Sequence, residues 1–91
     1  MIVELNPSRL AGDPATLLEA IATELGLVVR LRSTLATYPG SIHWHFQRPG
    51  ERGTLELTWW PSGGRLWLKV HPMRSAPWIE GCVAEWVARL P

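Results

Sequence analysis

The sequence predicts an α+β domain in which an antiparallel meander sheet of three to four strands carries an N-terminal and a C-terminal helix on one face. Two observations predict it. Apolar residues recur at helical spacing near both ends of the chain, and they alternate with polar residues in the middle. A chain of 91 residues supports one hydrophobic core. Residues 1–91 are therefore expected to form a single domain.

The first helix is predicted over residues 14–25. The Asp13 side chain can accept hydrogen bonds from the free amides of a first turn, and Pro14 suits the first helical position. Apolar residues then recur at helical spacing on one face, and Gly26 ends the pattern. These signals together define both ends of the helix.

The second helix is predicted at the C-terminal end. Ser75 is the expected N-cap, and Pro77 lies in the first turn. One apolar stripe along this helix is expected to face the core: Ile79, Cys82, Val83, Trp86 and Leu90.

The middle of the chain alternates with a period of two, which is typical of half-buried strands. In residues 27–34, "LVVRLRST", the alternation directs Leu31 inward and both Arg30 and Arg32 outward. The pattern leaves open whether residues 1–5, "MIVEL", add an edge strand. Three further runs, separated by breaker-rich turns, predict hairpins: "SIHWHFQ" (41–47), "TLELTWW" (54–60) and "RLWLKVH" (65–71).

Adjacent tryptophans at the end of one run point to opposite faces of the sheet. Trp59 shares its parity with the apolar core residues, whereas Trp60 belongs to the outer face. Hairpin geometry then predicts the outward-facing pairs Trp60–Arg65, Thr58–Trp67, Glu56–Lys69, His45–Glu56 and His43–Thr58. A cation–π contact between Arg65 and Trp60 and an ion pair between Glu56 and Lys69 are expected.

Charge is distributed unevenly along the chain. Residues 27–74 contain seven basic and two acidic residues, a net charge of +5, whereas the whole chain carries +1. Tryptophan and arginine on one open face are typical of interfaces. We therefore expect a small non-catalytic binding module, which would take a protein partner or a second copy through Arg30, Arg32, His43, His45, Trp60, Arg65, Trp67 and Lys69.

Three alternatives remain open. The same residues would suit single-stranded nucleic acid, because aromatic rings stack on bases and arginines contact phosphates. The face could also be merely solvated. The third alternative is a metal-binding protein or an enzyme, although the sequence contains no phosphate loop, nucleophile elbow or paired carboxylates on the open face.

The metal alternative depends on "HWH", which places two imidazoles on one face. His71 is expected about 7 Å along the sheet and two strands away from His45, too far for one ion. His43, His45 and Glu56 are the remaining candidates for a two-histidine, one-carboxylate set. Exposed strand histidines more often bind nothing, so no metal or other cofactor is predicted.

Location and membrane association follow from the same sequence. Cys82 is the only cysteine, so no intramolecular disulfide can form, and a reducing compartment is expected. The first residues lack the features of a signal peptide, and no apolar run is long enough to span a membrane. The expected location is cytoplasmic, with no membrane partner.

Overall fold

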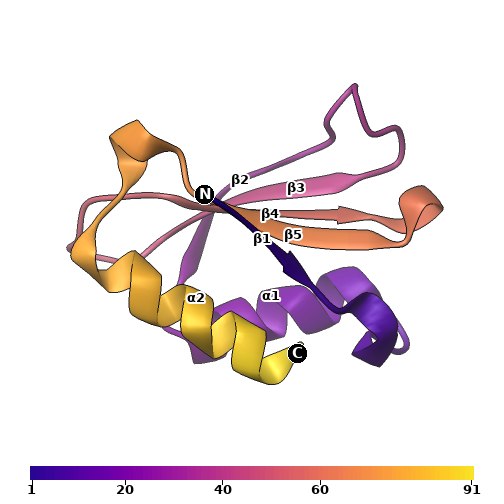
Figure 1. Ribbon diagram of the computed structural model, residues 1–91, viewed down its shortest axis with the longest axis horizontal. Coiled ribbons are helices and arrows are strands. Elements are labelled where there is room, and N and C mark those ends of the chain that lie inside the picture. Colours follow the sequence, from indigo (N-terminus) through magenta and orange to yellow (C-terminus); the bar gives the residue numbers. More distant parts are fainter.

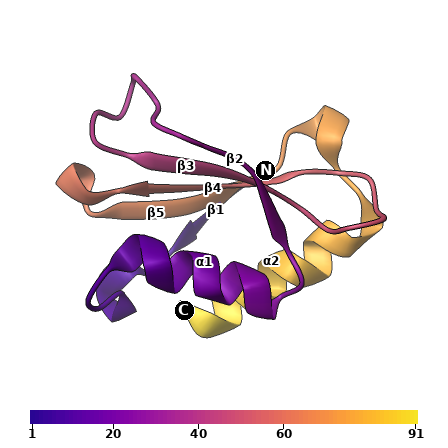
Figure 2. The ribbon, with the colours of Figure 1, turned by 180° about the vertical axis from the view of Figure 1, so that it is seen from behind.

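The computed structural model describes all residues 1–91 and has the α+β architecture that the sequence predicts. Figure 1 shows the sheet nearly edge-on, with both helices on the same side of it, and Figure 2 shows the same layers from behind. Three short 3₁₀ turns, at residues 7–9, 61–63 and 72–74, connect the larger elements. Those larger elements are β1 (Ile2–Leu5), α1 (Pro14–Glu24), β2 (Val28–Ser33), β3 (Ile42–Gln47), β4 (Leu55–Trp60), β5 (Arg65–Lys69) and α2 (Pro77–Arg89).

The sheet has five strands in the order β1-β5-β4-β3-β2, and every neighbouring pair is antiparallel. The prediction of three to four strands was therefore too low. The additional strand is β1, which pairs with β5 along its whole length. The first residues therefore form one edge of the sheet and β2 forms the other.

The register of the two central hairpins agrees with the expected pairing. His43 lies opposite Thr58 and His45 lies opposite Glu56. In the β4–β5 pair, Glu56 lies opposite Lys69, Thr58 opposite Trp67 and Trp60 opposite Arg65, as predicted. Because side chains alternate along a strand, this register fixes which of them share the outer face.

The N-terminal helix begins as expected. The Asp13 carboxylate accepts a hydrogen bond from the Ala15 amide, and Pro14 occupies the first position. The predicted cap of the second helix was wrong, because Ala76 is the N-cap and makes no side-chain hydrogen bond. Pro77 starts α2 and has no amide hydrogen, so one of the four unpaired amides at the start of this helix is absent.

One hydrophobic core fills the space between the sheet and the two helices. It contains 19 buried residues drawn from both helices and from the inward side of the sheet. Phe46 on β3 stacks between Trp44 and Trp86, with ring centroids 6.2 and 6.0 Å apart. The opposite face of the sheet carries no helix (Figure 1).

A β-bulge in β2 overturns one part of the predicted pattern. The register shifts between Val29 and Leu31, so Leu31 pairs with His45 and Arg32 pairs with Trp44. Arg32 therefore lies on the helix side, where it donates a hydrogen bond to Glu19 at 2.7 Å and lies 5.8 Å from the Trp44 ring centroid. The predicted inward position of Leu31 and outward position of Arg32 were wrong.

Membrane insertion of a helix has no support in this fold. Neither α1 nor α2 combines the length and the hydropathy that crossing a bilayer requires.

Candidate metal centre on the outer sheet face

The connection between β2 and β3 covers one end of the outer face, which the sequence predicted to be open. Tyr38 in this connection makes edge-to-face contacts with Trp60 and Trp67, each with ring centroids 5.0 Å apart. Trp67 is only 5% exposed. The prediction that Trp67 lies open to a partner was therefore wrong, because residues 34–41 fold back over the sheet rather than merely joining two strands (Figure 1).

Trp60 has a structural role at the same end of the sheet. Its indole Nε1 donates a hydrogen bond to the Pro39 carbonyl at 3.1 Å. On its other side the ring lies against Gly63, where an added Cβ would come within 2.3 Å of the ring. The outward tryptophan thus ties the β2–β3 connection to the β4–β5 turn.

The cations of the outer face have different partners from those expected. Arg65 lies over Trp67, 4.1 Å from the ring centroid, rather than over Trp60. It also donates two hydrogen bonds to Glu4, at 2.9 and 2.6 Å, which hold the pKa of the Glu4 carboxyl below its ordinary value. The expected ion pair between Glu56 and Lys69 does not form, and Lys69 makes no ion pair.

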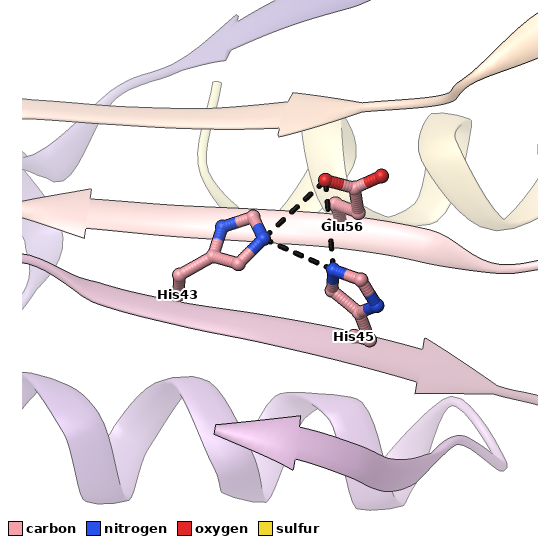
Figure 3. Close-up of side chains that lie close together, drawn as sticks. All are labelled: His43, His45 and Glu56. Carbon is pink, nitrogen blue, oxygen red and sulfur yellow. Dashed lines mark hydrogen bonds and ion pairs between the residues drawn. The ribbon is translucent and has the colours of Figure 1, made fainter. Parts of the chain in front are cut away.

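Glu56 instead faces two histidines of the neighbouring strand. Figure 3 shows the carboxylate of β4 and the imidazoles of His43 and His45 on β3 converging on one point. The Glu56 Oε1 atom lies 3.3 Å from His43 Nε2 and 3.7 Å from His45 Nε2, and the two Nε2 atoms are 3.1 Å apart. No other set of three His, Cys, Asp or Glu side chains converges in this way.

These separations fit one metal ion. Atoms 3.1, 3.3 and 3.7 Å apart lie on a circle of radius about 2.0 Å, which is close to a Zn–N or Zn–O bond of about 2.0–2.2 Å. With all three bonds near 2.1 Å, the angles at the ion average about 107°, close to the tetrahedral value of about 109°. An ion bound here would keep a fourth position for a further ligand.

A second layer orients the first histidine. His43 Nδ1 and Thr58 Oγ1 are hydrogen-bonded at 2.8 Å, and both residues are buried. When Nδ1 donates to this hydroxyl, Nε2 presents its lone pair to the cluster. Burial lowers the pKa of His43 below its ordinary value, although the nearby Glu56 charge acts in the opposite direction. Burial thus favours the neutral imidazole that binds metal, and the hydrogen bond to Thr58 favours the tautomer whose Nε2 carries no hydrogen.

A cavity of about 210 Å³ borders this cluster. His43, Glu56 and Thr58 form one side of it, and Lys69 and Arg65 add two cations. Its apolar walls come from Ile2, Leu35, Tyr38 and Trp67. A larger hollow of about 640 Å³ lies between the start of α2 and the chain after β5, and it contains no histidine or basic residue.

The remaining predicted residues lie apart from the cluster. Arg30 donates a hydrogen bond to Gln47 near the β2 edge, and Arg32 lies on the helix side. His71 follows β5, and its Nδ1 accepts a hydrogen bond from the Met73 amide. Cys82 is buried in the core, which raises the pKa of its thiol.

Two features of the site were missed at the level of sequence. Tyr38 is the only tyrosine and lies in a turn beside Pro39. An aromatic residue in a connecting turn was the sequence feature that could have indicated its contact with the sheet. Thr58 was placed opposite His43, but its hydrogen bond to the imidazole was not anticipated.

Comparison of the chain with protein-family models, curated proteins and solved structures finds no match.

Proposed function

We propose that this domain binds one divalent transition-metal ion, zinc in the first place, through His43, His45 and Glu56. The observation that carries the proposal is the mutual separation of three ligand atoms, which matches a single ion with bonds of about 2.1 Å. Two imidazoles and a carboxylate are also ligands that zinc and other divalent metals prefer.

Hydrogen bonding alone explains this cluster less well. A carboxylate oxygen has no hydrogen, so only N–H groups of His43 and His45 could link the three atoms. These two N–H groups can each donate one hydrogen bond, so at most two of the three atom pairs can be hydrogen-bonded. A cation at the centre satisfies all three pairs at once.

The position of the cluster favours tight binding. The ligands come from β3 and β4, which have paired strands on both sides. Glu56 is only partly exposed, with 13% of its side chain open to solvent. A rigid backbone and a partly dry site hold ligands in place before the ion arrives, so little ordering opposes binding.

Calorimetric titration of metal-free protein with zinc tests the proposal. We expect about one zinc per chain, and His45→Gln is expected to weaken binding by about 100-fold or more because it removes one of three ligands.

His71→Gln is the matched control, because His71 lies outside the cluster and should leave zinc affinity unchanged. Equal loss of zinc binding in both variants, or no saturable binding by the unmodified chain, would contradict the proposal.

Partner binding by the outer face, to a protein, a second copy or single-stranded nucleic acid, stays a second candidate. What supports it is the pair of half-exposed side chains on the free β2 edge, Val29 at 44% and Leu31 at 43%. The buried state of Trp67 counts against an aromatic stacking platform. A mass that rises with concentration in sedimentation would favour self-association, and a constant monomer mass would count against it.

The proposed location is a reducing compartment, the cytoplasm, supported by a single cysteine that is buried.

A further inference from the structure

The proposed metal ion is held by His43, His45 and Glu56, and the empty space of the adjacent cavity is not needed to hold it. His43 and Glu56 belong both to the cluster and to the cavity wall, so the space next to two of the three ligands is the cavity. A three-ligand zinc site leaves one position for water or another molecule. A molecule in this cavity would therefore lie beside the ion.

The charged groups around the cavity favour a negatively charged ligand. Glu56 is the only carboxylate on its wall, and in the proposed site that carboxylate is a metal ligand. Arg65 is already bound to Glu4 by two hydrogen bonds, whereas Lys69 makes no ion pair. The metal ion and the Lys69 ammonium thus leave positive charge without a counterion in the cavity.

Shape and polarity restrict the anion further. A volume of about 210 Å³ is below the 300 Å³ or so of pockets for drug-sized ligands, so the cavity suits a small molecule. The same cavity is also lined by the apolar side chains of Leu35, Tyr38 and Trp67. A small molecule that has a single carboxylate and a compact apolar or aromatic body complements both the charged and the apolar residues of this lining.

We propose that the metal-loaded protein binds a small monocarboxylate in this cavity, with the carboxylate at the open position of the ion and beside Lys69 and the apolar body against Tyr38 and Trp67. This inference rests on the proposed metal site. Lys69 makes no ion pair, so its substitution removes an ammonium from the cavity without breaking an ion pair.

Titration of cobalt(II)-loaded protein with benzoate tests the inference, since the visible spectrum of cobalt(II) reports its coordination. We expect a saturable change with benzoate, and an affinity for benzamide, its neutral analogue, at least about tenfold lower. Lys69→Met should weaken benzoate binding about tenfold while retaining the cobalt spectrum. Arg9→Met is the control, because Arg9 is exposed at the turn after β1 and has no contact with the cavity.

The outcomes separate the two proposals. If the protein takes up no cobalt, the metal site itself fails. If cobalt binds but benzoate leaves the spectrum unchanged, or acts equally on the unmodified chain and on Lys69→Met, the carboxylate inference alone is overturned. Release of cobalt into the filtrate on adding benzoate would also overturn it, because that result shows competition for the metal rather than binding beside it.

Discussion

At the scale of single residues, substitution of Thr58 tests whether the cluster is a metal site or only a polar cluster. Its hydroxyl lies 2.8 Å from His43 Nδ1, on the side of the ring away from the cluster. Valine has nearly the same shape but cannot accept the Nδ1 hydrogen. Loss of such second-layer partners typically lowers metal affinity 10- to 100-fold.

Thr58→Val is accordingly predicted to lower zinc affinity by about 10- to 100-fold, measured by competition with a chromophoric chelator. Thr58→Ser keeps the hydroxyl and should restore most of the affinity. Thr54→Val is a matched control, since Thr54 is also buried but its hydroxyl accepts a hydrogen bond from Gln47. Equal affinity for Thr58→Val and the unmodified chain would show that the hydroxyl does not orient the ligand.

Strand parity and hairpin register predicted which residues are neighbours, but not which neighbours bind each other. Glu56 was correctly placed opposite both His45 and Lys69. The choice between them depends on side-chain rotamers and on burial, which the alternation of residues does not encode. The structure turns the carboxylate to the histidines, so a residue set that the sequence only suggested becomes the candidate site.

At the scale of elements, the β2 bulge shows a second limit of the sequence pattern. Residues 28–33 contain no glycine or proline to mark an irregularity. The bulge reverses the faces of Leu31 and Arg32, which gives Arg32 its contact with Glu19 on α1. One extra residue in a strand therefore changed two predicted orientations while leaving the strand itself correctly predicted.

The β2–β3 connection is the element that changes the interpretation of the outer face. Tyr38→Ala should lower the free energy of unfolding by about 1–3 kcal/mol, because two edge-to-face aromatic contacts of about 0.5–1.5 kcal/mol each are lost. It should also shift tryptophan emission to longer wavelength as Trp67 meets water. Chemical denaturation followed by fluorescence measures both effects.

Tyr38→Phe keeps the ring and should behave like the unmodified chain. If Tyr38→Ala shows neither lower stability nor a red shift, the connection does not cover the sheet in solution, and Trp67 is available to a partner as the sequence first indicated.

At the scale of the whole molecule, one face of the sheet forms the hydrophobic core and the other carries the candidate metal site. The helices and the inward side chains form a core of 19 buried residues that requires no ligand. The cluster lies on the opposite face, on strands whose positions that core fixes (Figure 3). Metal binding is therefore expected to stabilise a fold that already exists, by about 2.7 kcal/mol when free zinc is 100 times its dissociation constant.

The most direct measurement of the central claim is an anomalous difference map from crystals of the zinc-loaded protein, recorded at the zinc absorption edge. We expect one peak per chain, about 2.0–2.2 Å from His43 Nε2, His45 Nε2 and a Glu56 carboxylate oxygen. A peak at any other site, or no peak between these three atoms in crystals grown with excess zinc, would contradict it.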